Sequence, residues 1–129
     1  MNNTLKKLGC VFVKVMAILT LCFLLFWGGS LARIWILTNR HAHEFTYGYR
    51  QTRMLDDGLP DRIRVISYFE DKAIVYYSQR AGSRNELPRS GVGVLVTFSR
   101  TDSGWLLYSW EVIWSASGSA DGFIWPLIR

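Results

Sequence analysis

Residues 15–32 read VMAILTLCFLLFWGGSLA and contain no charged side chain, while Lys14 and Arg33 flank them directly. As an α-helix rising about 1.5 Å per residue, this stretch would be roughly 27 Å long, close to the roughly 30 Å hydrocarbon core of a bilayer. Lys14 can extend its ammonium to the lipid headgroups, so the outer limits of the span are residues 8–37. The sequence predicts one transmembrane helix at 15–32, preceded by a short basic tail, residues 1–14.

The same residues also fit a cleavable secretory signal peptide. Lys6 and Lys7 precede the apolar run, and Ser30 and Ala32 place small residues at the two positions that a signal peptidase inspects. The run is longer than the usual apolar region of about 7 to 15 residues, and apolar residues resume directly after Arg33. We therefore expect an uncleaved anchor, with cleavage after Ala32 as the alternative.

The charges on either side of the span bear on its orientation in the membrane. Three lysines precede it, which favours a cytoplasmic N-terminus. Four arginines follow it within about 20 residues and oppose that bias; they are Arg33, Arg40, Arg50 and Arg53. We expect the remainder of the chain to be extracytoplasmic, either periplasmic or extracellular.

Residues 33–129 have room for one small domain, and their charge is nearly balanced. They contain twelve basic residues against ten acidic ones, so they lack the basic surface of a nucleic-acid-binding protein. All but one of these basic residues are arginines, which suit protein interfaces and lipid headgroups. Both cysteines, Cys10 and Cys22, fall in or beside the apolar run, so the domain has no disulfide framework.

After the apolar run, a helical period gives way to a period of two. Ile34, Leu37, Ala42 and Phe45 recur at helical spacing, which predicts that the helix continues to about residue 45 and ends before Gly48. Alternating apolar residues then predict four strands, at residues 62–69, 73–80, 91–100 and 105–114. Asp102 and Gly104 belong to a turn between the last two strands, with Gly104 free to adopt positive φ.

The alternation also predicts which side chains share a face of the sheet. In the first strand these are Ile63, Val65, Ser67 and Phe69. In the third strand they are Val92, Val94, Val96 and Phe98. In the fourth strand they are Leu106, Tyr108, Trp110, Val112 and Trp114, with Glu111 on the opposite face.

This order predicts an α+β fold in which the end of the long helix packs on a small antiparallel meander of four to five strands. Such a helix followed by a meander with a Trp-rich last strand resembles the architecture of the cystatin-like and NTF2-like class over residues 33–128. The resemblance rests on element order alone and implies no function.

Few residues offer catalytic or metal-binding chemistry. His41 and Glu44 lie on one face of the predicted helix, whereas His41 and His43 point apart and cannot share a metal ion. We therefore predict no catalytic residue, cofactor or metal. A small enzyme would need His41, Glu44 and Glu111 to converge in one cleft. Residues 56–61 and 115–122 are predicted to be a turn and a flexible link.

The sequence favours a non-catalytic accessory or assembly subunit of a membrane complex, which binds the lipid bilayer and other membrane subunits. A membrane-tethered inhibitor or immunity-type protein with a single target is the alternative. The candidate contacts with partners or lipid are basic and aromatic side chains. They are Arg33, Arg40, Arg80, Arg84, Arg89, Phe123 and Trp125.

Overall fold

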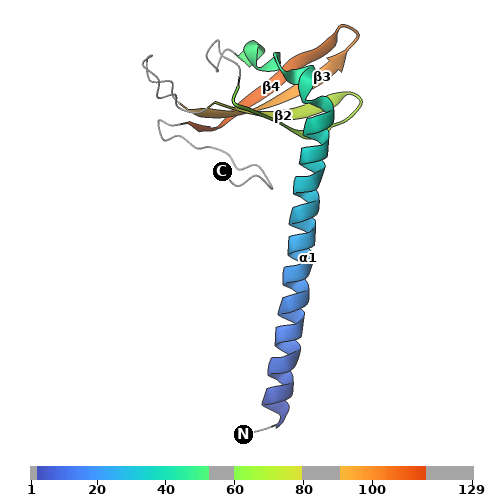
Figure 1. The fold of residues 1–129 in the computed structure, drawn as a ribbon, viewed down its shortest axis with the longest axis vertical. Coiled ribbons are helices and arrows are strands. Elements are labelled where there is room, and N and C mark those ends of the chain that lie inside the picture. The colour runs from blue at the N-terminus through green and yellow to red at the C-terminus, as the bar shows by residue number, and fades with distance from the viewer. Residues whose placement is uncertain (1–2, 53–59, 80–90, 116–129) are drawn as a thin grey trace. The chain divides into compact units, whose positions relative to one another are not determined.

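The computed structural model describes residues 3–52, 60–79 and 91–115, and it contains one long helix, two 3-10 helices and four strands in those ranges (Figure 1). The elements are α1 (Asn3–His41), η1 (Ala42–Phe45), η2 (Gly48–Thr52), β1 (Arg62–Tyr68), β2 (Lys72–Gln79), β3 (Val92–Thr101) and β4 (Gly104–Ser115). The chain divides into two compact units, Met1–Ala32 and Arg33–Arg129.

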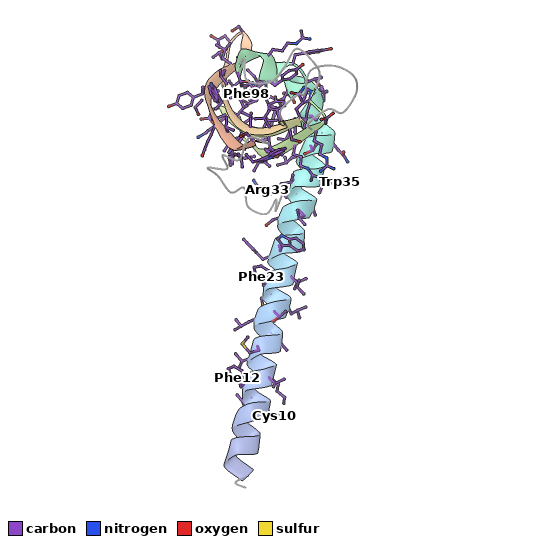
Figure 2. The ribbon with its side chains drawn as sticks, turned by 90° about the vertical axis from the view of Figure 1, so that its left-hand side faces the viewer. Cys10, Phe12, Phe23, Arg33, Trp35 and Phe98 are labelled. Atoms are coloured by element: carbon purple, nitrogen blue, oxygen red, sulfur yellow. The ribbon has the colours of Figure 1, made fainter. Side chains whose placement is uncertain are left out.

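The first unit contains the apolar part of α1. The helix exposes its side chains throughout residues 9–26, including Leu21, Leu25 and Phe26, and Phe12 and Phe23 project outward from the ribbon in Figure 2. The helical stretch Gly9–Phe45 is long and apolar enough to cross a membrane, and no part of its most apolar window is buried within the structure. It therefore differs from the core helix of a soluble domain.

The second unit is built on one antiparallel sheet with the strand order β1-β2-β3-β4. Each strand pairs with its neighbour in sequence, as in a meander. The predicted α+β class, with one N-terminal apolar helix and a four-stranded antiparallel sheet, is thus confirmed.

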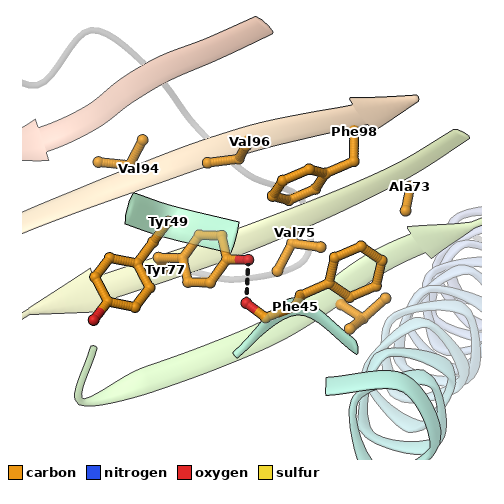
Figure 3. Close-up of a cluster of buried hydrophobic side chains, with 9 residues drawn as sticks. Phe45, Tyr49, Ala73, Val75, Tyr77, Val94, Val96 and Phe98 are labelled. Carbon is orange, nitrogen blue, oxygen red and sulfur yellow. Dashed lines mark hydrogen bonds between the residues drawn. The ribbon is translucent and has the colours of Figure 1, made fainter. Parts of the chain in front are cut away.

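The hydrophobic core lies between one face of the sheet and the segment that follows α1 (Figure 3). Its fully buried members are Phe45, Tyr49, Val65, Ala73, Val75, Tyr77, Val94, Val96 and Phe98. Phe45 comes from η1 and Tyr49 from η2. The helix was predicted to end before Gly48, and this prediction misses η2. The chain continues there as a 3-10 helix, which buries Tyr49 and Thr52.

One buried hydrogen bond joins the sheet to this covering segment. The Tyr77 hydroxyl donates to the Phe45 carbonyl oxygen at 2.7 Å, and the bond is drawn as a dashed line in Figure 3. Burial raises the pKa of Tyr77, so its hydroxyl stays protonated and remains a donor. The aromatic core is therefore also tied by a polar contact.

A bulge in β1 corrects the face predicted for its second half. The pairing shifts between Val65 and Ser67, so Ile66 is the extra residue. Because a bulge changes the parity of the alternation, Tyr68 lies opposite Ala73 on the core face. Phe69, which the alternation placed on the same face as Ile63 and Val65, is exposed.

The apolar face predicted for β3 is confirmed, because Val94, Val96 and Phe98 are core residues. In β4, two bulges change which side chains face the core. The pairing shifts around Tyr108 and again around Ile113. As a result Trp105 and Leu107 pack on the core, although the simple alternation placed Leu106 and Tyr108 on the apolar face. Gly104 has φ +118°, as expected for its turn.

On the sheet face away from the core, Trp114 lies against the backbone of Gly93. A Cβ atom at Gly93 would come within 2.1 Å of Trp114 Nε1 and 2.7 Å of the Tyr76 hydroxyl oxygen. The absence of a side chain there lets the Trp114 indole donate to Tyr76 at 2.7 Å. Trp114 is thus on the opposite face of the sheet from Trp105.

Candidate functional site

Glu44 is the centre of a polar cluster at the end of the helical segment. Its carboxylate accepts three hydrogen bonds, from His41 Nδ1 at 2.7 Å, from Trp105 Nε1 at 3.0 Å and from the Tyr68 hydroxyl at 3.2 Å. His41 is the last residue of α1, whereas Tyr68 and Trp105 belong to β1 and β4. One carboxylate therefore connects the helix end to both edge strands.

Aromatic contacts hold the donors in place. The His41 ring stacks on Tyr68, with centroids 3.7 Å apart and planes inclined by 17°. Tyr68 meets Trp105 edge-on at 5.5 Å, and Phe45 contacts Trp105 at 5.4 Å from the core side. Arg100 completes the cluster, with its guanidinium carbon 5.5 Å from the centre of the Trp105 ring. The imidazole and the indole are thus positioned by packing as well as by hydrogen bonds.

The environment keeps Glu44 ionised. Partial burial acts to raise its pKa, but the hydrogen bonds from His41, Trp105 and Tyr68 and the charge of His41 outweigh that effect, and the pKa is lowered. The pKa of Tyr68 is raised, first by burial and then by the neighbouring Glu44 charge and hydrogen bond, while Arg100 opposes the shift. An ionised Glu44 can only accept hydrogen bonds, so the Nδ1–H of His41 is the donor in this pair. The other ring nitrogen, Nε2, takes no part in the bond to Glu44.

Within the described residues, this arrangement places an imidazole beside a carboxylate, and neither Tyr68 nor Glu111 adds a free reactive group to that pair. The Tyr68 hydroxyl already donates to Glu44, and its raised pKa disfavours the phenolate. Glu111 lies opposite Leu95, on the sheet face away from the core, and it makes no hydrogen bond with His41 or Glu44. Of the three residues that an enzyme would need to bring together, the structure brings together His41 and Glu44.

Residues 3–52, 60–79 and 91–115 contain no set of side chains suited to bind a metal ion. No group of three His, Cys, Asp or Glu side chains in those ranges is placed to hold an ion. A shallow depression near the β1–β2 and β3–β4 turns does collect acidic side chains beside Arg100, and the Asp71 carbonyl accepts the Arg100 backbone N–H at 2.8 Å. That depression is lined by Glu70, Asp71, Arg100, Thr101, Asp102 and Gly104.

The predicted contact residues are distributed unevenly over the described chain. Arg33 and Arg40 are exposed on α1. The other five, Arg80, Arg84, Arg89, Phe123 and Trp125, lie outside the described residues, as do most of the predicted turn at 56–61 and the link after Ser115. These predictions therefore stay predictions.

Two features of the site were missed by sequence reasoning. Tyr68 and Trp105 were assigned to strands without a polar role, because the β1 bulge that turns Tyr68 toward Glu44 leaves no mark in the alternation. The second feature is the exposed apolar surface of β4, formed by Leu106, Tyr108 and Trp110. Its signal is the composition of the strand, where Glu111 is the one charged residue among twelve.

Comparison with known proteins adds no relative. No family model, curated protein or solved structure matches this chain. The architectural resemblance to cystatin-like and NTF2-like proteins consequently gains no support from a solved structure.

Proposed function

We propose that this protein is a single-pass membrane protein that acts as a non-catalytic accessory or assembly subunit, holding partners through protein contacts. The observation that carries the proposal is the exposure of the uncharged, mostly apolar side chains of α1 over residues 15–26. A soluble monomer rarely exposes a contiguous apolar patch of more than a few hundred Å². Lipid is the environment that matches such a surface, and the uncharged length suits one crossing.

The chemistry of the second unit supports a role in binding. Its clearest polar cluster places Glu44 between three donors, an arrangement that stabilises the link between the helix end and the sheet. Among the residues that the structure describes, its large exposed side chains outside α1 include Tyr47, Tyr108, Leu106 and Phe69. Exposed aromatic residues are typical of surfaces that bind other proteins.

The domain is proposed to lie outside the cytoplasm. The support is the basic N-terminal segment, with Lys6, Lys7 and Lys14 before the span. Protease added to intact cells or spheroplasts should digest the domain, while a cytoplasmic control protein survives. Protection of the domain until the membrane is opened would contradict this orientation.

Copurification tests the proposed function. The full chain, tagged at its C-terminus and expressed at its natural level, should bring down the same partner proteins from several mild detergents. The matched control is the tagged chain in which Leu21 and Leu25 are replaced by Arg, which should not enter the membrane. If the wild-type chain is extracted as a monomer with no specific partner, the accessory role is wrong.

A further inference from the structure

The last turns of α1, from residue 33 onward, have one face that belongs to the domain. Ile34 is 3% exposed, and Leu37 packs against the core cluster. Thr38 Oγ1 accepts the Val65 N–H of β1 at 2.9 Å. Because residues three and four positions apart share a face of a helix, Ile34, Leu37 and Thr38 form one contact surface. The contact between α1 and the domain thus begins two residues after the uncharged run ends.

The opposite face of the same turns is apolar where the helix leaves that run. Trp35, which is labelled in Figure 2, is 66% exposed, and Ile36 is 54% exposed. One turn later the exposed residues are Asn39 and Arg40. A helix that covers a soluble domain carries polar residues on its outer face. The outer face of α1 meets that expectation only from Asn39 onward.

The position of Trp35 and Ile36 along the helix matches the polar layer of a bilayer. Residues 33–36 continue α1 and extend about 6 Å past residue 32. The headgroups add roughly 5 to 8 Å on each side of the hydrocarbon core. Tryptophan is enriched in this layer because its ring is amphipathic. An exposed Trp35 therefore has a suitable environment directly beyond a span at residues 15–32.

The charges on the outer face fit the same layer. Arg33, Ile36 and Arg40 are spaced by three and four residues, so they form one stripe along the helix. Neither arginine forms an ion pair within the part of the chain that the structure describes. None of residues 1–43 is acidic. Phosphate groups of lipids are anions that arginine binds with two parallel hydrogen bonds.

We propose that the outer face of α1 over residues 33–40 contacts the phospholipid headgroups, with Trp35 and Ile36 inserted among them and Arg33 and Arg40 bound to lipid phosphates. This inference rests on the proposed single-pass anchor and names the surface at which the span ends. Since Ile34 lies in the same stretch, the contact between helix and domain begins at the lipid surface.

Depth measurements with spin labels test the position of this face. The full chain, with Cys10 and Cys22 replaced by Ser, is labelled through Ile36→Cys in vesicles of phosphatidylcholine and phosphatidylglycerol. Leu25→Cys marks the hydrocarbon, and Asn39→Cys is the matched control, since it is also exposed on α1. The label at 39 should be at least about twofold more accessible to a water-soluble nickel chelate than the label at 36, because it lies about 4.5 Å further along the helix axis. The label at 36 should in turn exceed the label at 25.

Photo-crosslinking tests what covers the face. A photo-crosslinking phenylalanine analogue at position 36 should give phospholipid adducts in native membranes. In the mixed vesicles, the share of phosphatidylglycerol among the adducts should exceed its share of the bilayer by about twofold, because arginines near the surface attract anionic lipid. Arg33→Gln combined with Arg40→Gln should remove this excess. Lys6→Gln combined with Lys7→Gln is the matched control, which deletes two charges before the span and should leave the excess unchanged.

The other outcomes separate this inference from the proposed function. A label at 36 that is as accessible to the chelate as the label at 39, or as inaccessible as the label at 25, would contradict the inference. So would a protein adduct in place of a lipid adduct at position 36, or an excess of phosphatidylglycerol that is insensitive to the arginine substitutions. In each case a label at 25 that stays in hydrocarbon means that the single-pass anchor stands. If the label at 25 is also accessible to the chelate, the proposed anchor itself is wrong.

Discussion

The apolar residues of α1 and those of the sheet are chemically alike but have opposite environments. Leu21, Leu25 and Phe26 are exposed along α1, whereas Val75, Val96 and Phe98 are buried in the core of the second unit. Burial of apolar surface contributes about 25 cal/mol per Å² in water, so the sheet gains stability from its own fold. Residues 9–26 of α1 make no such gain within the structure, and we propose that lipid stabilises them.

The largest effect is expected from charges placed in the helix. In a Leu21→Arg, Leu25→Arg variant, each arginine should cost about 3 kcal/mol of insertion free energy at the bilayer centre. The chain should then be lost from the membrane fraction. The matched control is Asn39→Arg, which adds an arginine at an exposed position of α1 outside residues 15–32. Equal membrane fractions for both variants would remove the distinction between the two regions.

The core side of the comparison is tested by truncation of Phe98. Its side chain is 1% exposed and contacts Phe45 and Tyr77, so Phe98→Ala should lower the free energy of unfolding by about 3 to 5 kcal/mol. Phe69→Ala, at a residue that is 55% exposed, should change it by less than about 0.5 kcal/mol. Denaturant titration of the full chain in detergent, followed by circular dichroism, measures both.

Glycine substitutions separate the two regions with a smaller change. An added Cβ at Gly93 would overlap Trp114 and the Tyr76 hydroxyl, so Gly93→Ala should destabilise the sheet by about 1 to 3 kcal/mol. At Gly28 in α1 nothing lies within 4 Å of such an atom, and Gly28→Ala should leave the unfolding of the sheet unchanged. A similar response at both positions would mean that the Gly93 contact does not form.

The smallest expected effect concerns the Glu44 cluster. The pKa of Glu44 is lower in the folded chain than in the unfolded one, so its contribution is complete above the unfolded pKa and is lost as the pH falls through the folded pKa. At neutral pH, Glu44→Gln should reduce stability by about 1 kcal/mol. Unfolding free energies of the wild type and the variant, measured between about pH 7 and pH 3, should converge toward the acid end. A difference that stays constant with pH would show that the Glu44 charge does not contribute.

Hydrophobic patterning was sufficient to predict the order of the long helix and the four strands. The long uncharged run predicted the apolar helix, and the alternation around Val94 and Val96 predicted the central strands correctly. The alternation is visible in the sequence because successive side chains of a regular strand point alternately to the core and to the solvent. The boundaries of β2 and β3 are close to those predicted for the same reason.

The bulges and the polar cluster could not be predicted in this way. A bulge inserts one extra residue into a strand and leaves no signal in the residue composition. That Tyr68 rather than Phe69 lies on the core face is therefore visible only in the strand pairing. The bond from Trp105 to Glu44 joins residues separated by 61 positions. Spacing along the chain identified His41 and Glu44 as neighbours, but it carries no information on partners that distant strands supply.

Fractionation of cells that express the full chain, followed by N-terminal analysis of its mature form, tests most directly whether the helix remains in the membrane. Our account predicts that the chain sediments with membranes, resists extraction by alkaline carbonate and retains residues 15–32. A mature chain that begins at Arg33 and is recovered in the soluble fraction would contradict it.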